Sequence, residues 1–402
     1  MTLEMEEKYL SKRVQNIQES QTLQITGRAK KMASEGKDVV SLSAGEPDFP
    51  TPDFVCEAAI KAIKDNFTKY TAVQGIPELR KAIAEKLLQE NNLKYSPEQI
   101  VVSNGGKQSI ANIFLALLNP NDEVVFQSPY WVSYPEMAHL CDAKEVVIHT
   151  DITTNFKMTP EQVKNALTDR TKIFVFNSPS NPTGTVYTEE EIRAIMEVLR
   201  DRKDIFIISD EIYEYLVYGD VKHFSPAQIE GFFDRVITVN GVSKAYSMTG
   251  WRIGYAAGPK WILDAANKIQ SQTTSNPASI SQKGALAGIL GGKDFIETMK
   301  KAFVDRRDFM YEELNKIDGM KVNKPDGAFY IFVSVEGLLG KTFGGKEMKT
   351  SADFANYLLD NFYLATVPGD AFGAEGYLRL SYADSMENLQ KAVERMQKAV
   401  NS

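Results

Sequence analysis

Short apolar runs alternate with helical patterns up to about residue 259, and this alternation restricts the possible folds more than any other feature. The runs cover residues 100–103, 123–126, 145–149, 172–177, 205–210 and 236–240. Helical patterns such as 107–118 and 189–200 lie between them. Strands that are apolar on both faces are typical of parallel sheets, because crossover helices cover both sides. We therefore predict an α/β fold whose large domain is a mostly parallel, doubly wound sheet flanked by helices.

Beyond about residue 259 the pattern changes to long helical stretches followed by a small unit of mixed structure. Helical periodicity dominates residues 261–314. Strand-like runs at 328–335 and 377–382 flank a helical pattern near 351–361, and a last helix begins at Met386. These patterns predict a second, smaller α+β domain. We expect residues 1–48 to form an N-terminal arm and part of the small domain, 49–288 the large ligand-binding domain, and 289–402 the small C-terminal domain.

The charge balance and the lack of long apolar runs argue against several classes of protein. The chain has 46 Lys and Arg against 53 Asp and Glu, a net charge of −7, unlike the basic surface of a nucleic-acid binder. No run of about 18 apolar residues suggests a membrane span, and the first 20 residues lack the apolar core of a signal peptide. Cys56 and Cys141 do not suggest a disulfide framework. We expect a cytoplasmic protein that binds neither nucleic acid nor membrane.

A glycine pair follows the first apolar run, where the chain passes from strand to helix. The sequence Asn104-Gly105-Gly106-Lys107 comes directly after residues 100–103 and opens a helical pattern. Ligands of doubly wound sheets bind beyond the carboxyl ends of the strands. Backbone N–H groups at a glycine-rich helix start can bind a phosphate. The alternative interpretation is a tight turn with no ligand.

Three further polar residues also come at or just after the ends of apolar runs. Asn181 lies between Pro179 and Pro182, two prolines whose peptide bonds are candidates for the cis form. Asp210 ends the run 205–210, where a buried carboxylate needs a partner. Lys244 follows the run 236–240, and a buried lysine readily becomes a neutral nucleophile. The alternatives are a proline-rich turn, a helix N-cap and a surface lysine; together, however, the residues suggest one shared cleft.

These motifs resemble those of the class I aminotransferases among the fold type I pyridoxal-phosphate-dependent enzymes, over essentially the whole chain. The stretch from Ser243-Lys244 to Arg252 and Gly254 resembles the specific lysine signature of that family. The bacterial aspartate aminotransferase subgroup is the most similar, through SLSAGEPDF, KYTAVQGIPELR, GGKQ, SPYWVSYPEM, SPSNPTG, SDEIYE, MTGWRIGYA and YLRLSYA. The resemblance implies that the large domain, 49–288, binds pyridoxal 5'-phosphate.

The resemblance also implies how each matched residue holds the cofactor. Lys244 bonds to its aldehyde, Asp210 pairs with the ring nitrogen and Tyr213 donates to the ring hydroxyl, so these three are the expected catalytic residues. Asn181 lies beside the ring, and either Trp131 or Tyr130 stacks on it. The phosphate is expected to contact Gly105, Gly106, Ser243 and Arg252, together with Tyr70 of a neighbouring subunit, and Lys107 is a further expected cofactor-binding residue. The contact of Tyr70 requires a homodimer with shared active sites.

For the substrate, the resemblance implies that Arg379 binds the α-carboxylate and that the backbone at Gly45 closes over it. Trp131 and Asn181 also line this part of the site. In another subgroup an arginine of the neighbouring subunit binds the distal carboxylate; that position is Ser271 here. We therefore assign the distal carboxylate to Lys107. A lysine is a point charge on a flexible stem, so selectivity is expected to be looser than with an arginine.

The expected reaction is transfer of the amino group of L-aspartate to 2-oxoglutarate, which gives oxaloacetate and L-glutamate by a ping-pong mechanism. The alternative keeps the chemistry but changes the substrate to prephenate, an aromatic amino acid or alanine. A nucleotide-binding enzyme is disfavoured, because Gly340-Lys341-Thr342 lacks the earlier glycine of a phosphate-binding loop: position 335 is valine. His139, His149 and His223 have no ligand spacing, so no metal is expected.

Overall fold

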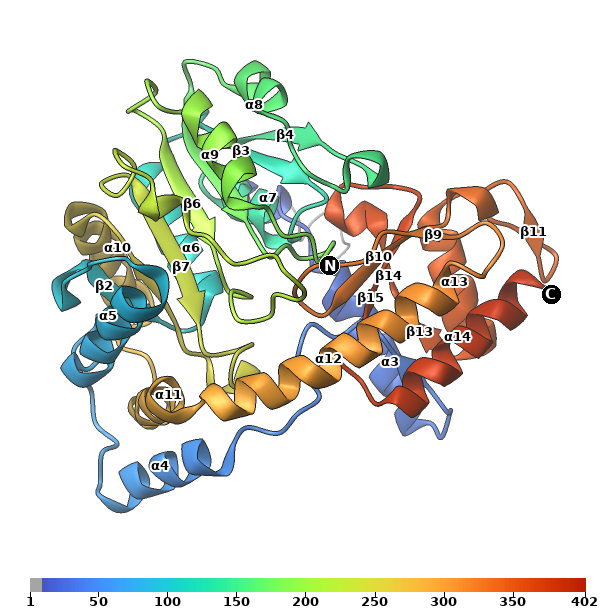
Figure 1. Cartoon of the computed structure of the whole chain (residues 1–402), viewed down its shortest axis with the longest axis horizontal. Helices are drawn as coiled ribbons and strands as arrows, with labels where there is room; N and C mark the ends of the chain where they lie inside the picture. The colour runs from blue at the N-terminus through green and yellow to red at the C-terminus, as the bar shows by residue number, and fades with distance from the viewer. Residues whose placement is uncertain (1–8) are drawn as a thin grey trace.

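The large part of the molecule is built on a seven-stranded sheet with the order β2-β8-β7-β6-β5-β3-β4. The computed structural model describes residues 9–402, so residues 1–8 of the predicted arm lie outside the described part (Figure 1). The strands are β2 (Ile100–Ser103), β3 (Glu123–Ser128), β4 (Lys144–His149), β5 (Thr171–Asn177), β6 (Phe206–Asp210), β7 (Val236–Gly241) and β8 (Gly254–Ala257). Strands β4, β3, β5, β6 and β7 pair in parallel, whereas β8 is antiparallel to both neighbours. The predicted mostly parallel sheet is confirmed.

Helices cover both faces of this sheet, because alternate strand residues point in opposite directions. In β5, Phe174 and Phe176 belong to one buried core, while Ile173 and Val175 belong to another. The first core contains residues of α4 (Asp53–Lys64), α5 (Pro77–Asn91), α8 (Pro160–Ala166), α9 (Glu189–Val198) and α11 (Ser279–Gly291). The second contains residues of α6 (Gly106–Leu117), α7 (Ser133–Leu140) and α10 (Lys260–Thr273). The sheet is therefore doubly wound.

Local sequence signals explain where several helices begin. Pro77 occupies the first turn of α5, where its missing N–H costs nothing. Thr188 caps α9 by accepting a hydrogen bond from the Glu191 N–H, and the Glu191 side chain reciprocates. The helix α6 starts at Gly106 with no side-chain cap, so its first N–H groups remain available to a ligand.

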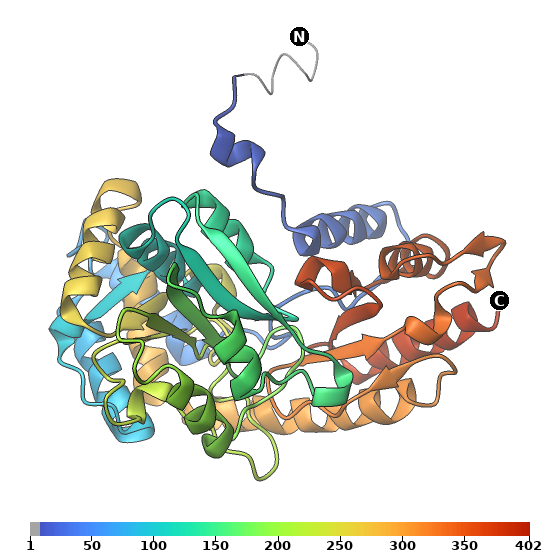
Figure 2. The same cartoon turned by 90° about the horizontal axis from the view of Figure 1, so that it is seen from above.

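A smaller lobe surrounds a four-stranded antiparallel sheet with the order β14-β15-β10-β9. Its elements are β9 (Lys321–Val322), β10 (Tyr330–Ser334), β14 (Val367–Pro368), β15 (Tyr377–Ser381), α12 (Lys293–Leu314), α13 (Ser351–Phe362) and α14 (Met386–Val400). The N-terminal part contributes α3 (Gln21–Ser34) and β1 (Val40–Ser41), which pairs in parallel with β13 (Leu364–Ala365). Figure 2 shows α3 beside this lobe. The domain boundaries at 49 and 289 stay a prediction.

One helix joins the two parts without interruption. Ile296 of α12 belongs to the core of the large sheet, whereas Met299, Phe303 and Met310 of the same helix belong to the core of the small lobe. Val40 and Leu42, far away in sequence, also belong to the core of the small lobe. None of the helices among residues 9–402 is long and apolar enough to cross a membrane.

Candidate active site

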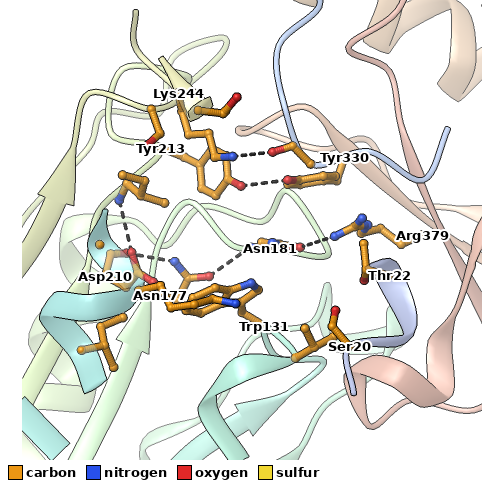
Figure 3. A pocket seen from close by; sticks show the side chains of 18 of the residues that line it. Ser20, Thr22, Trp131, Asn177, Asn181, Asp210, Tyr213, Lys244, Tyr330 and Arg379 are labelled. Atoms are coloured by element: carbon orange, nitrogen blue, oxygen red, sulfur yellow. Dashed lines mark hydrogen bonds between the residues drawn. The ribbon is translucent and has the colours of Figure 1, made fainter. Parts of the chain in front are cut away.

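A cavity of about 340 Å³ lies where the carboxyl ends of the large-sheet strands meet the small lobe. It gathers most of the predicted site residues: Gly45, Gly106, Lys107, Trp131, Asn181, Asp210, Tyr213, Ser243, Lys244, Arg252 and Arg379. Figure 3 shows Lys244, Asp210, Trp131 and Arg379 facing this cavity from different elements. Residues separated by more than 300 positions along the chain thus share one site.

Asp210 is the last residue of β6, and its carboxylate is buried in the floor of the cavity. The Tyr134 hydroxyl on α7 donates to Oδ2 at 2.6 Å, and the Ile212 backbone N–H donates to Oδ1 at 3.4 Å. Burial raises the pKa of Asp210 to about 6, although both hydrogen bonds favour the charged form. Tyr134 belongs to the motif SPYWVSYPEM, but no role was predicted for it from the sequence.

Lys244 follows β7 and reaches into the cavity from the opposite side. Its ammonium donates to the carbonyl oxygen of Gly45, which comes from the small-lobe side of the cavity. Burial lowers the pKa of Lys244 to about 8, while the nearby Glu46 carboxylate opposes that shift. A lysine in this condition supplies a neutral amine close to physiological pH, as nucleophilic and general-base chemistry requires.

Tyr213 lies in the turn after β6, and its hydroxyl is 2.8 Å from the Tyr330 hydroxyl of β10. Burial raises the pKa of Tyr213 well above its ordinary value, so the phenol keeps its proton and can donate it in a hydrogen bond. The Lys244 ammonium is 6.0 Å from the centre of the Tyr213 ring. Tyr330 also lines the cavity and was not predicted.

The glycine pair forms a close-fitting cradle at the start of α6. Gly105 has φ +84°, and a Cβ there would lie 2.4 Å from Nη2 of Arg252. A Cβ on Gly254 would lie 2.2 Å from the backbone nitrogen of Gly106. Arg252 donates to the carbonyl oxygen of Thr249 at 2.9 Å, which holds its guanidinium beside the helix start. Free N–H groups, a helix dipole and a guanidinium together favour a phosphate group.

Arg379 of β15 is a buried cation that has no carboxylate partner among residues 9–402. Its Nη1 donates to Oδ1 of Asn181 at 3.1 Å and its Nη2 donates to the carbonyl oxygen of Ser43 at 2.7 Å. Its Nε is buried without a partner. Burial lowers the pKa of Arg379. An uncompensated guanidinium of this kind suits a ligand carboxylate, which it can bind through two parallel hydrogen bonds.

Asn181 is aimed into the cavity by its proline-rich segment, as the sequence predicted. The peptide bonds before Pro179 and Pro182 are both cis. The backbone N–H of Asn181 donates to Oδ1 of Asn177 at 3.0 Å, and Asn177 in turn donates to the carbonyl oxygen of Asp210 at 2.9 Å. Asn177 therefore connects two predicted site residues, a role that its place at the end of β5 did not reveal.

Lys107 lies in the first turn of α6, with its ammonium 5.1 Å from the centre of the Trp131 ring. Burial and the nearby Arg252 lower the pKa of Lys107. No described carboxylate forms an ion pair with it, so its charge is free for a ligand. Ser20, Thr22 and Leu23 line the same cavity from the N-terminal segment. Nothing in their local sequence indicates this position, because it depends on how the small lobe is placed.

Three predicted site residues do not line this cavity. Tyr130 packs edge-on against Phe126 at 5.2 Å and lines an adjoining cavity, so of the two predicted stacking residues Trp131 is the one that lines the candidate site. Tyr70 is 91% exposed and lies outside the cavity. Gly105 is not part of the lining either, but it shapes the cradle next to Gly106. Ser271 is a surface residue of α10 outside the lining.

A doubly wound sheet with a buried lysine, a buried aspartate, a glycine cradle and a guanidinium without a carboxylate partner, all around one cavity, is the arrangement expected of an enzyme of the aminotransferase type. Comparison with known proteins agrees with that class. The chain belongs to the family described as aminotransferase class I and II, whose sequence pattern matches residues 37–396.

Similar proteins and structures cover nearly the whole chain. An aspartate/prephenate aminotransferase of Cereibacter sphaeroides is 49% identical over 391 residues, which are 97% of this chain and 98% of that protein. A bifunctional aspartate aminotransferase and glutamate/aspartate-prephenate aminotransferase of Petunia hybrida is 46% identical over 97% of this chain and 82% of its own length. The crystal structure of the aspartate aminotransferase from Rhizobium meliloti superposes with a TM-score of 0.94 at 44% identity, covering 98% of each chain.

Proposed function

We propose that this aminotransferase transfers the amino group of L-aspartate to 2-oxoglutarate, giving oxaloacetate and L-glutamate, with pyridoxal 5'-phosphate as its cofactor. The observation that carries the proposal is the convergence of Lys244, Asp210 and Arg379 on one cavity. Relatives that are 46–49% identical over nearly the whole chain are named aspartate or aspartate/prephenate aminotransferases.

The residues present fit this cofactor at both of its ends. The cradle of Gly105, Gly106 and Arg252, with Ser243 beside it, offers donors and positive charge to a phosphate. At the other end, Asp210 would pair with the protonated ring nitrogen, and a cationic partner would return the carboxylate to its charged form. Pyridoxal phosphate, when bound, supplies an electron sink for the carbanion left after the α-proton departs.

The chain's own residues then divide the remaining tasks. The Lys244 amine, which loses its proton readily, takes the proton from the substrate α-carbon and returns it as a general acid. Arg379 binds the α-carboxylate and fixes the substrate orientation, replacing its present hydrogen bond to the Ser43 carbonyl oxygen. Trp131 supplies an aromatic surface against the cofactor ring, and Tyr213 a hydrogen-bond donor at its edge.

Lys107 is the proposed partner of the second carboxylate. It is the cation in the first turn of α6, and the Ser20 and Thr22 side chains line the same cavity. Because a lysine lacks the fixed fork of an arginine, it tolerates distal acids of different geometry. Prephenate, which also has a second carboxylate, is therefore the second candidate amino acceptor, and it agrees with the names of several relatives.

The first experiment replaces Lys244 by alanine in protein saturated with pyridoxal phosphate. The wild type is expected to show a visible cofactor band and to convert aspartate and 2-oxoglutarate, whereas the Lys244→Ala variant loses about 10²- to 10⁴-fold in kcat, because the acid–base group is gone. Turnover that persists in this variant at the wild-type rate would remove Lys244 from the mechanism. A panel of keto acids that includes prephenate would then rank the acceptors.

The second experiment replaces Lys107 by alanine and compares two amino donors. Loss of a charge-assisted hydrogen bond is expected to lower kcat/KM for aspartate by about 10- to 100-fold. The same ratio for alanine, which has no distal carboxylate, should change little. An equal loss for both donors would show that Lys107 acts on the cofactor or the fold instead of on the second carboxylate.

We also propose a cytoplasmic homodimer in which Tyr70 reaches the phosphate site of the neighbouring subunit. Tyr70 belongs to the motif KYTAVQGIPELR and stands 91% exposed, so its side chain is available to a second chain. Cys56 and Cys141 are both free, as in a protein from a reducing compartment.

A further inference from the structure

A buried ionic network lies behind the strand ends that carry the site. Lys86 of α5 and Glu214 form an ion pair whose side chains are only 6% and 5% exposed. Asn240 donates to the same Glu214 oxygen, Oε1, at 2.8 Å, and Asn91 donates to Oε2 at 2.8 Å. The two Glu214 oxygens thus accept three hydrogen bonds, two from α5 and one from β7.

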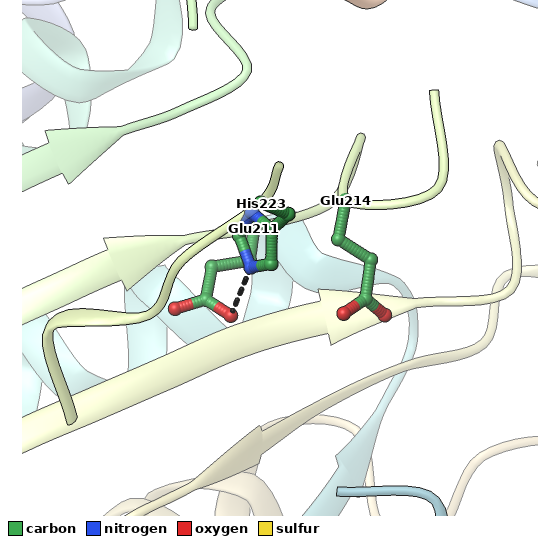
Figure 4. Close-up of side chains that lie close together, drawn as sticks. All are labelled: Glu211, Glu214 and His223. Carbon is green, nitrogen blue, oxygen red and sulfur yellow. Dashed lines mark hydrogen bonds and ion pairs between the residues drawn. The ribbon is translucent and has the colours of Figure 1, made fainter. Parts of the chain in front are cut away.

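A second ion pair, between Glu211 and His223, lies close to the first. Figure 4 shows Glu211, Glu214 and His223 together, and one ligand atom from each lies within 4.8 Å of the others. His223 donates to Glu211 at 3.1 Å, and Ser209 and Ser225 donate to the same carboxylate. Burial opposes a charged imidazole, but Glu211 outweighs it and raises the pKa of His223. Because both carboxylates are satisfied by donors, the cluster is an internal charge network and not a metal site.

Glu214 connects the two segments that carry the proposed catalytic groups. It stands one residue after Tyr213 and four after Asp210, in the turn that leaves β6. Its partner Asn240 lies in β7, four residues before Lys244. The Asn240 side chain also accepts a hydrogen bond from the Gly241 N–H at 2.7 Å, so its orientation is fixed. The Glu214–Asn240 bond therefore joins these segments beneath the cavity.

Stability alone does not account for such a network. A buried ion pair loses its hydration, and replacing it by apolar residues is often neutral or stabilising. A fully hydrogen-bonded buried network instead makes the surrounding segments rigid and fixes their relative positions. Resting on the proposed function, we propose that Glu214, anchored by Lys86, is a positioning residue that sets the Asp210–Tyr213 turn relative to Lys244 through Asn240.

The test compares two asparagines that make the same hydrogen bond to Glu214. Asn240→Ala cuts the link to β7, whereas Asn91→Ala removes from α5 both a donor to Glu214 and an acceptor of Lys86 but leaves the link to β7 intact. In holoenzyme, Asn240→Ala is expected to weaken pyridoxal phosphate binding and lower kcat by about tenfold or more, as displaced catalytic groups do. It should also move the pH titration of the visible cofactor band. Asn91→Ala should leave the band and kcat near their wild-type values, with a comparable fall in Tm.

A charge-neutral double variant separates positioning from folding. Lys86→Met combined with Glu214→Met removes both charges, so the protein is expected to fold with a Tm above that of either single variant. Positioning predicts that its cofactor affinity and band titration stay altered despite that Tm. The inference is overturned if the double variant, or Asn240→Ala, binds pyridoxal phosphate and titrates as the wild type does. A wild type without a cofactor band would instead refute the proposed function itself.

Discussion

At the scale of single residues, burial prepares two side chains for opposite tasks. It raises the pKa of Asp210 to about 6 and lowers that of Lys244 to about 8, so both pKa values lie closer to neutral pH than they do in water. The largest opposing contact is the Tyr134 hydroxyl at Asp210 and the Glu46 carboxylate near Lys244. Those contacts are where the site can be adjusted without removing a catalytic group.

Replacing Tyr134 by phenylalanine tests the first contact. The hydroxyl favours the charged form of Asp210, so its loss is expected to raise that pKa further and weaken the carboxylate's hold on the ring nitrogen. A shift of about one unit corresponds to roughly tenfold in kcat near neutral pH, and the acid limb of the pH–rate profile should move upward. Tyr130→Phe, outside the cavity, is the control. Identical profiles for the two variants would contradict this role.

Lys244 gives a prediction about stability and pH in protein freed of cofactor. The pKa of Lys244 is about 8 in the folded protein and 10.5 in the unfolded chain, so the unfolded chain binds more protons between pH 8 and pH 10.5. Stability therefore rises with pH through that window, and the cost of the buried charge is fully present below pH 8. The unfolding free energy of Lys244→Met should exceed that of the wild type by about 3 kcal/mol at pH 7, and the two should converge above about pH 11 in urea titrations. Parallel curves would exclude a buried charge.

Much of the site was predictable from the sequence, because its residues stand at the ends of apolar runs. Lys244, Asp210, Asn181 and the glycine pair were identified as candidates in that way, and the family resemblance added Arg379. Tyr134 and Asn177 were missed because their roles depend on side-chain hydrogen bonds across neighbouring elements. Ser20, Thr22 and Leu23 were missed because no local pattern places the N-terminal segment at the cavity.

At the scale of elements, the alternating pattern predicted every parallel strand of the large sheet but not β8. Gly254–Ala257 consists mainly of glycine and alanine, so it lacks the β-branched residues that indicate a strand. The small residues have a physical reason, since Gly254 lies against the backbone of Gly105 and Gly106. The small residues that make β8 hard to predict from the sequence also allow it to pack closely against Gly105 and Gly106.

The cradle itself can be tested at Gly105. Alanine there would need φ +84° and would place its Cβ 2.4 Å from Arg252 Nη2, so the loop or the arginine must move. Gly105→Ala is expected to weaken cofactor binding by about tenfold or more, measured by absorbance titration, since strain of about 1–3 kcal/mol is imposed on the phosphate donors. Gly250→Ala, where no atom lies within 4 Å of the added Cβ, is the matched control. Equal cofactor affinities of the Gly105→Ala and Gly250→Ala variants would show that the cradle does not bind the phosphate.

At the scale of the whole molecule, the proposed homodimer predicts that two chains complete each site, with the exposed Tyr70 of one chain at the phosphate site of the other. Lys244→Ala and Tyr70→Ala homodimers should each have low activity. In a mixed dimer, one site combines the intact Lys244 of one chain with the intact Tyr70 of the other. Mixing and refolding the variants is therefore expected to restore up to about a quarter of wild-type activity, if half of the dimers are mixed and one site in each works. Light scattering fixes the dimer mass, and no recovery on mixing would place Tyr70 outside the neighbouring site.

The continuous helix α12 gives the molecule a mechanical character of its own. Its 22 residues contain neither proline nor glycine, so there is no point at which it readily kinks. At 1.5 Å per residue it is roughly 33 Å long. Ile296 packs in the core of the large sheet, and Met299 and Met310 pack in the core of the small lobe. A pivot of about 5° at the Ile296 end sweeps the far end through about 3 Å. Any rotation of the small lobe about the Ile296 end of α12 would therefore displace its parts in proportion to their distance from that residue.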